Sequence, residues 1–257
     1  MKVAFAGTAP LAAGVLERLA ETQPIAYLLT RPDAPRGRGR HPGPPPAKVV
    51  AERLGIAVHQ PERPELTEPV DRVVVCAYGL YIPSRLLEQS LWLNVHPSLL
   101  PRWRGAAPVE RAILAGDAET GVTIHRTVEE LDAGPIAAQE AFAVGDLDAG
   151  GVYERAAEVA ARLLGDVLAD PVFTPQPDDG ATYAEKIAPA DRELDLSRPA
   201  QELVNRVRAL SPHIGARLGD LLVWRARVGE DGAFEPLEVQ PAGGKRMPYD
   251  AYLRGRR

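Results

Sequence analysis

Cysteine and long hydrophobic runs are nearly absent from this 257-residue sequence. The only cysteine, Cys76, lies inside the apolar run of residues 73–77, so no intramolecular disulfide can form and an oxidising compartment is not implied. Its apolar neighbours predict a buried core residue rather than a nucleophile. No segment approaches the ~20 apolar residues that span a membrane, and the apolar run at the N-terminus is too short for a signal peptide. We therefore expect a cytoplasmic protein without a membrane partner.

Metal-ligand spacing and the dinucleotide-binding glycine motif are also missing. The five histidines show no spacing typical of a metal site, so no metal is expected; they are His41, His59, His96, His125 and His213. The first predicted turn, Gly7–Pro10, lacks the three glycines that let a pyrophosphate approach the backbone. Its proline fits the first turn of a helix, so the turn is interpreted as a plain connection from strand to helix.

The composition is that of an ordinary globular protein, with 45% hydrophobic and 25% charged residues, which argues against extensive disorder. A chain of 257 residues is near the length at which one hydrophobic core gives way to two, so two domains are expected. The net charge of -5 is unevenly distributed. Residues 203–257 hold ten Lys or Arg against six Asp or Glu, whereas residues 1–202 hold twenty against twenty-nine. The basic C-terminal part suits either phosphate contacts or a solvated surface.

The order of the predicted elements is typical of a doubly wound, Rossmann-like α/β sheet, because short apolar strands alternate with segments of helical spacing. Strands are predicted at Lys2–Ala6, Ile25–Leu29, Val70–Ala77, Leu91–Val95 and Val122–His125, and helices at Leu11–Leu19, Ala47–Leu54 and Ala149–Leu168. Beyond a proline-rich stretch at residues 170–180, one more helix is predicted at Pro199–Leu210, followed by short strands at Leu221–Val228 and Leu237–Val239.

A long loop between Thr30 and Lys48 is dense in proline, glycine and arginine. It is too long for an ordinary connection between a strand and a helix, and long loops in compact domains are often functional. Its centre is Gly37-Arg38-Gly39-Arg40. These arginines either grip phosphates or are merely solvated, and charge alone does not choose between the two.

Two polar residues stand close together at the end of one predicted strand. Asn94 and His96 are two positions apart, so they project to the same face at the carboxyl end of Leu91–Val95. Open α/β sheets bind their ligands at that edge. An amide donor beside an imidazole suits acyl transfer, in which an oxyanion develops and an amine loses a proton. A carboxylate at Asp132, in the turn after Val122–His125, would orient His96 and favour its protonated form.

Pattern alone leaves a second interpretation open, in which Asn94 and His96 merely satisfy the polar groups of a turn. The flanking residues go further. Residues 94–108, Asn-Val-His-Pro-Ser-Leu-Leu-Pro-Arg-Trp-Arg-Gly-Ala-Ala-Pro, resemble a signature of the folate-dependent formyltransferase family, and in particular of its members that act on methionyl-tRNA. Further similar stretches run nearly from end to end: residues 5–8, 32–33, 37–39, 77–80, 115–124, 182–186 and 240–243, with Lys245.

The resemblance implies transfer of the formyl group of 10-formyltetrahydrofolate to the amino group of methionyl initiator tRNA, for translation initiation. Asn94, His96 and Asp132 fall on the family's catalytic positions. Asn94 and protonated His96 would stabilise the tetrahedral oxyanion, while Asp132 would hold His96 and assist proton removal from the amine. The folate-binding residues implied are Ser98, Leu99, Leu100, Pro101, Tyr78, Gly79 and Leu80, and the tRNA-binding residues are Gly37, Arg38, Gly39, Arg40, Lys245 and Arg246.

The C-terminal part is shorter than is usual in this family, whose second domain resembles an OB barrel that helps to hold tRNA. We therefore expect a catalytic domain at residues 1–175, a linker at 176–190 and a small, shortened OB-like domain at 191–257.

Two rival interpretations remain. One is a formyltransferase that acts on a small amine, such as an amino sugar nucleotide or glycinamide ribonucleotide; residues 102–104 and 240–243 argue against it. The other is a non-catalytic RNA-binding protein with the same fold, which the presence of all three polar residues disfavours.

Overall fold

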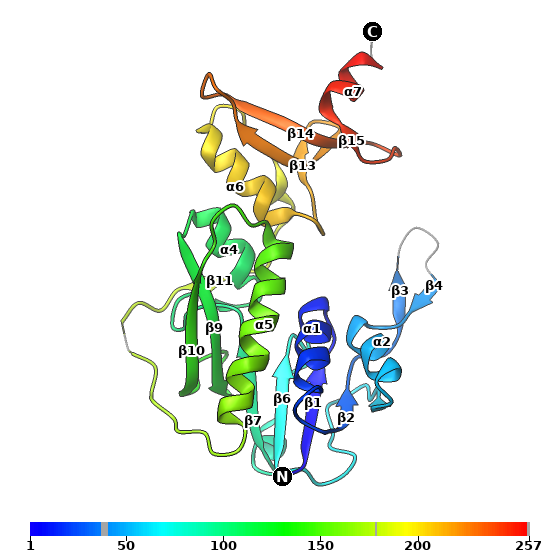
Figure 1. Ribbon diagram of the computed structural model, residues 1–257, viewed down its shortest axis with the longest axis vertical. Helices are drawn as coiled ribbons and strands as arrows, with labels where there is room; N and C mark the ends of the chain where they lie inside the picture. The colour runs from blue at the N-terminus through cyan, green and yellow to red at the C-terminus, as the bar shows by residue number, and fades with distance from the viewer. Residues whose placement is uncertain (37–40, 178, 256–257) are drawn as a thin grey trace. The chain divides into compact units, whose positions relative to one another are not determined.

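The computed structural model describes residues 1–36, 41–177 and 179–255, and these form two compact units (Figure 1). Unit 1 consists of residues 1–104, 121–141 and 154–182. Unit 2 consists of residues 105–120 and 142–153 together with the chain from Tyr183 onward. Each unit is thus assembled from three separate stretches of sequence.

Unit 1 is built on a seven-stranded sheet with the order β10-β9-β7-β6-β1-β2-β5. The strands β5, β2, β1, β6 and β7 are parallel to one another, and β9 is antiparallel to β7. The predicted α/β architecture with a mainly parallel sheet is confirmed. The strands are β1 (Val3–Gly7), β2 (Ile25–Leu29), β5 (Ala57–His59), β6 (Arg72–Cys76), β7 (Leu91–His96), β9 (Glu119–Arg126) and β10 (Ile136–Ala143).

The strand order reverses at β1, which has β2 on one side and β6 on the other. Ligands of open α/β sheets bind beyond the carboxyl ends of the strands near such a point. Gly7 ends β1, and a Cβ atom at this position would lie 2.7 Å from the Cβ of Ala12 in α1 (Pro10–Leu19). Glycine therefore allows the helix to pack directly against the end of the strand. Pro10 occupies the first helical turn, as predicted.

Both faces of this sheet are covered. Figure 1 shows α1 beside α5 (Ala149–Val167) on the near face. A Cβ atom added at Gly14 of α1 would lie 3.1 Å from the Cβ of Ala157 in α5, so the two helices pack closely there. Alternate strand residues, such as Ala6 and Val75, point to the other face and join a buried cluster that includes Leu86 of α3 (Ser84–Leu87). A parallel sheet that is buried on both faces explains the nearly continuous apolar runs of its strands.

Unit 2 contains an antiparallel four-stranded sheet with the order β12-β13-β14-β15. Helix α6 (Ala200–Leu210) packs on it, with Leu203 and Val207 in one buried cluster with Val223 and Val239. Among the described residues no strand pairing closes this sheet into a barrel, so the predicted OB-like barrel is not confirmed. The elements of unit 2 are α4 (Pro108–Ala115), β11 (Tyr183–Ala184), a 3-10 helix (Pro189–Arg192), β12 (Ala216–Leu218), β13 (Leu221–Val228), β14 (Phe234–Pro241), β15 (Met247–Pro248) and α7 (Tyr249–Arg254).

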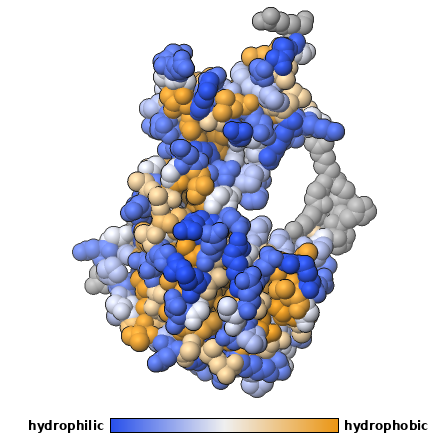
Figure 2. Space-filling view, in the orientation of Figure 1, coloured by the Kyte–Doolittle hydropathy of each residue, from blue (hydrophilic) through white to orange (hydrophobic). Residues whose placement is uncertain are grey.

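The loop between Thr30 and Lys48 has more structure than the sequence indicates. It contains a short hairpin of β3 (Ala34–Arg36) and β4 (His41–Gly43), followed by α2 (Pro46–Arg53). Residues 37–40 lie outside the described residues. On the face drawn in Figure 2, hydrophobic residues form separate patches among hydrophilic ones, as expected when most apolar side chains belong to the cores.

Candidate active site

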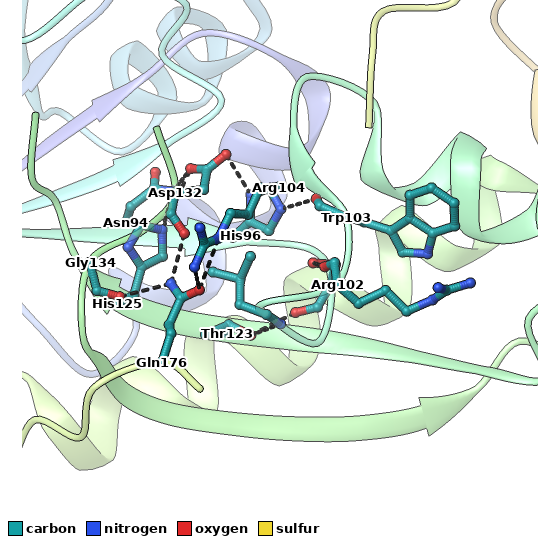
Figure 3. Close-up of polar contacts among 12 residues, drawn as sticks. Asn94, His96, Arg102, Trp103, Arg104, Thr123, His125, Asp132, Gly134 and Gln176 are labelled. Atoms are coloured by element: carbon teal, nitrogen blue, oxygen red, sulfur yellow. Dashed lines mark hydrogen bonds and ion pairs between the residues drawn. The ribbon is translucent and has the colours of Figure 1, made fainter. Parts of the chain in front are cut away.

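Strand pairing brings the predicted catalytic residues into one cluster in unit 1 (Figure 3). Asn94 and His96 occupy alternate positions at the end of β7, as predicted, and His96 is only 4% exposed. The antiparallel register places Asn94 opposite His125 of β9, and His96 opposite Thr123. The same face therefore carries a second histidine that the sequence analysis did not include in the site.

Asp132 completes the cluster from the turn that follows β9. Its Oδ2 atom lies 3.6 Å from Nδ1 of His96, and its Oδ1 atom lies 3.6 Å from Nε2 of His125. Asn94 donates from Nδ2 to Oδ1 of Asp132 at 3.4 Å. The structure therefore brings together Asn94, His96 and Asp132. Asp132 has φ of +50°, a left-handed conformation that costs a non-glycine residue free energy and is concentrated at functional sites.

Backbone carbonyls set the proton positions of both histidines. Nε2 of His96 lies 2.8 Å from the carbonyl oxygen of Trp103, and Nδ1 of His125 lies 3.0 Å from that of Arg126. A carbonyl only accepts, so these nitrogens carry the protons. Nδ1 of His96 is then the nitrogen that faces Asp132, and Nε2 of His125 accepts from the Asn94 amide at 3.0 Å. This assignment follows from the hydrogen-bond network.

Burial lowers the pKa of His96 below its usual value of 6.5. Asp132 and the hydrogen bond to Trp103 act in the opposite direction, whereas His125 adds to the lowering. Asp132 favours the protonated form of His96, as expected, but the loss of hydration outweighs the nearby carboxylate, so the expectation of a protonated His96 needs correction. A pKa below 6.5 favours the neutral form of His96 near pH 7.

The predicted folate-binding loop is fixed by side chains of the neighbouring strands. Thr123 donates to the carbonyl of Ser98 at 2.7 Å and accepts from the backbone N–H of Leu100 at 3.1 Å. Gln139 of β10 donates to the carbonyl of Leu100 at 2.9 Å. Ser98 and Leu100 are buried, whereas Leu99 and Pro101 are partly exposed. The loop is thus a rigid strip of backbone next to His96.

The second predicted folate-binding stretch contributes backbone rather than side chains. The Tyr78 side chain is buried in the core of unit 1, and burial raises the pKa of its hydroxyl to about 12. Its carbonyl accepts from the Thr8 hydroxyl at 2.8 Å. Gly79 is exposed with φ of +77°, and Leu80 is partly buried. Glycine removes the cost of the left-handed conformation at this turn.

The predicted tRNA-binding residues fall into two groups. Gly37, Arg38, Gly39 and Arg40 lie outside the described residues. Lys245 and Arg246 are exposed in unit 2, in the turn between β14 and β15. The Arg246 guanidinium lies 3.6 Å from the centre of the Trp224 ring and donates to the carbonyl of Pro212 at 2.9 Å. This stacking holds a cation at a fixed place on the surface.

Several residues that hold the site together are not predictable from the sequence pattern. Gln176, placed at the start of a linker, reaches the turn of Asp132 and bonds Arg104 (Figure 3). His125 was named only as the end of a predicted strand and among the histidines that show no metal-ligand spacing. Thr123 and His125 alternate along β9, so they share one face of the strand, and this was the one signal in the sequence. It could place them beside Asn94 and His96 only if the register of β9 against β7 were known.

Within residues 1–36, 41–177 and 179–255, neither a cluster of metal ligands nor a membrane-spanning helix is found. No group of three or more His, Cys, Asp or Glu side chains in this part of the chain is arranged to hold a metal ion. None of its helices is both long and apolar enough to cross a membrane.

Comparison with known proteins gives a consistent picture. The family model described as formyl transferase matches residues 1–168. Methionyl-tRNA formyltransferase from Halorhodospira halophila is 41% identical, over 100% of this chain and 96% of that protein. The alignment extends over 300 positions, so this chain of 257 residues is the shorter of the two.

Solved structures share the fold at low identity. HypX from Aquifex aeolicus, in complex with tetrahydrofolic acid, superposes with a TM-score of 0.71 at 19% identity, over 98% of this chain and 47% of that one. The sugar 3N-formyl transferase WlaRD, in the presence of dTDP and 5-N-formyl-THF, superposes with a TM-score of 0.68 at 15% identity, over 90% of this chain and 87% of that one. These likenesses concern the fold alone.

Proposed function

Since this chain belongs to the formyl transferase family, we propose that it transfers the formyl group of 10-formyltetrahydrofolate to the amino group of methionyl initiator tRNA, for translation initiation. The observation that carries the proposal is the meeting of Asn94, His96 and Asp132 at the end of β7. The relative from Halorhodospira halophila, 41% identical along the whole chain, supports the choice of acceptor. The proposed acceptor also implies a cytoplasmic reaction, which stays a prediction.

The reaction joins the amine nitrogen to the formyl carbon and breaks the bond from that carbon to the folate nitrogen. The amine loses a proton, and the folate nitrogen gains one as it leaves. Negative charge develops on the formyl oxygen in between, and a preorganised N–H donor stabilises it. Asn94 is the donor proposed for this oxygen. Its shorter hydrogen bond, 3.0 Å to His125, holds the amide at the end of β7, and the N–H that makes the longer one, 3.4 Å to Asp132, is proposed to turn to the formyl oxygen.

Neutral His96 is suited to accept the proton that the amine loses. Nδ1 of His96 faces Asp132, whose carboxylate stabilises the imidazolium that forms. The cation then lies beside the developing oxyanion among largely buried side chains, where such attraction is strong. His96 is therefore proposed to begin the reaction neutral and to become protonated during it.

The folate is proposed to bind along the strip of residues 98–101 and the exposed backbone of residues 77–80. Both segments follow the carboxyl ends of neighbouring strands, β7 and β6. Their backbone N–H and C=O groups suit the polar edge of a pterin ring.

The tRNA is proposed to contact two basic segments, Gly37–Arg40 and Lys245–Arg246. Catalysis is assigned to residues 1–175, and tRNA binding to a small domain at residues 191–257 that corresponds to a shortened OB-like module, with a linker between them. The basic balance of residues 203–257 supports this division, because tRNA binding depends on neutralising phosphates.

A panel of acceptors tests the proposed function. The protein is incubated with 10-formyltetrahydrofolate and, separately, with charged initiator methionyl-tRNA, an amino sugar nucleotide or glycinamide ribonucleotide. We expect the formyl group on methionyl-tRNA and not on the two small amines. Formylation of a small amine but not of charged tRNA would reject the proposed acceptor while leaving the family's chemistry in place.

A further inference from the structure

The side chain of Gln176 uses all of its hydrogen-bonding capacity within unit 1. Its amide nitrogen donates to the carbonyls of Asp132 at 2.7 Å and Gly134 at 2.8 Å. Its amide oxygen accepts two hydrogen bonds from the Arg104 guanidinium, at 3.1 Å from Nε and 2.6 Å from Nη2. An amide has two donor hydrogens and two acceptor lone pairs, and all four are engaged here.

The turn that Gln176 bonds carries a residue in a strained conformation. Asp132 has φ of +50°, so the free energy cost of this turn must be offset by surrounding contacts. Gln176 supplies two of them, on either side of Ala133. A shift of the turn would move the carboxylate that lies 3.6 Å from His96.

Arg104 connects the same amide to the other side of the site. Its side chain is 12% exposed, and it follows Trp103, whose carbonyl accepts from His96. Trp103 also has positive φ, of +64°, and its backbone N–H donates to the hydroxyl of Thr182 at 2.9 Å. Gln176 therefore links two segments that contact His96. One is the Trp103–Arg104 segment, whose carbonyl orients Nε2 of His96, and the other is the turn that places Asp132 opposite Nδ1.

Gln176 itself is held in place by backbone pairing. Two residues earlier, Thr174 exchanges hydrogen bonds of 2.8 and 2.9 Å with Ile136 at the start of β10. Figure 3 shows the Gln176 side chain pointing into the polar cluster, whereas the Trp103 ring points away from it. The segment after α5 is thus anchored beside the site and directs one glutamine into it.

We propose that Gln176 is a positioning residue of the formyl transfer reaction: its amide joins the 132–134 turn to Arg104 and thereby sets the Asp132 carboxylate against His96. This inference rests on the proposed function for its kinetic consequences only. The geometric consequence, the place of Asp132 relative to His96, holds for any acceptor.

The test compares Gln176→Glu and Gln176→Leu with the wild-type protein. Glutamate keeps the size of the side chain and still accepts from Arg104, but a carboxylate cannot donate to the carbonyls of Asp132 and Gly134. We expect Gln176→Glu to lower kcat for methionyl-tRNA by a factor in the tens, with both KM values within about twofold of wild type. A residue that only fills space would leave kcat unchanged in this variant, and kcat within twofold of wild type would overturn the proposal.

The variant Gln176→Leu allows a measurement that does not depend on enzymatic activity. The pKa of His96 is measured by NMR of the imidazole signals, assigned with a His96→Asn variant. Asp132 faces His96 from the turn and raises its pKa, whereas burial and His125 lower it. Release of Asp132 should therefore lower the His96 pKa further. An unchanged pKa in a folded Gln176→Leu protein would contradict the positioning role, and if that variant does not fold, Gln176→Glu decides.

Gln23→Glu is the matched control, because Gln23 also donates to a backbone carbonyl, that of Pro24, but lies outside the site. It should leave kcat and the His96 pKa unchanged. If the wild-type protein formylates no acceptor, the proposed function fails, and the NMR comparison still decides whether Gln176 positions Asp132.

Discussion

His96 differs from an ordinary surface histidine because it is almost completely buried beside a carboxylate. Burial lowers its pKa, so the folded protein holds it neutral at a pH where the unfolded chain already binds a proton. The contribution of His96 to the free energy of unfolding is complete above about pH 6.5, the pKa of a histidine in the unfolded chain. It is lost as the pH falls below that value. At residue scale, the same burial that prepares His96 to accept a proton makes the fold sensitive to acid.

His96→Asn should remove part of this acid sensitivity. Lowering the pH from 7.5 to 5.5 should reduce the free energy of unfolding of the wild-type protein more than that of the variant. The difference has an upper limit of about 1.4 kcal/mol for each pH unit below 6.5. Urea unfolding of both proteins at the two pH values measures it. An equal loss in both would show that the pKa of His96 is not lowered in the folded state.

The spacing of single residues predicted part of the site. Asn94 and His96 could be found because alternate residues of a strand share a face, whatever the rest of the fold. His125 could not, because its place opposite Asn94 depends on an antiparallel register that the sequence does not specify. Gln176 could not either, since it lies 44 residues from Asp132 and is brought back to it by a segment without regular structure.

The turn after β9 is the element on which the geometry of the site depends most. A Cβ atom at Gly134 would lie 1.8 Å from the carbonyl oxygen of Arg126, so no side chain fits there without a shift of the backbone. Gly165 of α5, by contrast, is exposed and has no atom within 4 Å of its Cβ position. The two glycines therefore predict opposite effects of the same substitution.

Gly134→Ala should lower both the free energy of unfolding, by about 1–3 kcal/mol, and kcat, because the turn must move and Asp132 with it. Gly165→Ala should raise the free energy of unfolding by about 0.5–1 kcal/mol, since alanine favours the helix, and leave kcat unchanged. Denaturant titration and initial rates on the two variants provide the comparison. A Gly134→Ala protein with normal stability and turnover would refute the tight packing of this turn.

Elements with strong local patterns were predictable. The strand β2 has the predicted bounds, Ile25–Leu29, and the helix α5 begins at Ala149 as predicted. Continuous apolar runs and helical spacing are local signals, so both could be found without knowing the fold. β10 was missed because its inward and outward residues are mostly small or polar, as in Ile136-Ala-Ala-Gln-Glu-Ala. The hairpin of β3 and β4 was missed because its prolines indicate a loop.

At the scale of the whole molecule, formyl transfer is proposed for residues 1–175, and tRNA contacts are proposed both there, at Gly37–Arg40, and in unit 2, at Lys245–Arg246. Within the described residues no ion pair engages Lys245, and Arg246 is held by Trp224. Arg254, in the same unit, is paired with Asp250. An exposed cation without an acidic neighbour contributes more to phosphate binding than one that is already paired.

Lys245→Ala should raise the KM for methionyl-tRNA about three- to tenfold and leave the KM for the folate unchanged. The dependence of tRNA affinity on salt should fall by about one unit of slope, because one phosphate contact is lost. Arg254→Ala is the matched control and should change the KM for tRNA less. Equal increases in the KM of both substrates would exclude a tRNA-specific role for Lys245.

The most direct test of the whole account is a single-turnover assay with a labelled formyl group on 10-formyltetrahydrofolate and charged initiator methionyl-tRNA. The wild-type protein should place the label on methionine. Asn94→Ala should do so at least about 100-fold more slowly while it stays folded at the assay temperature, because removal of one oxyanion donor costs a factor of about 100 to 1,000. Transfer at the wild-type rate by Asn94→Ala, or no transfer by the wild-type protein, would contradict the account.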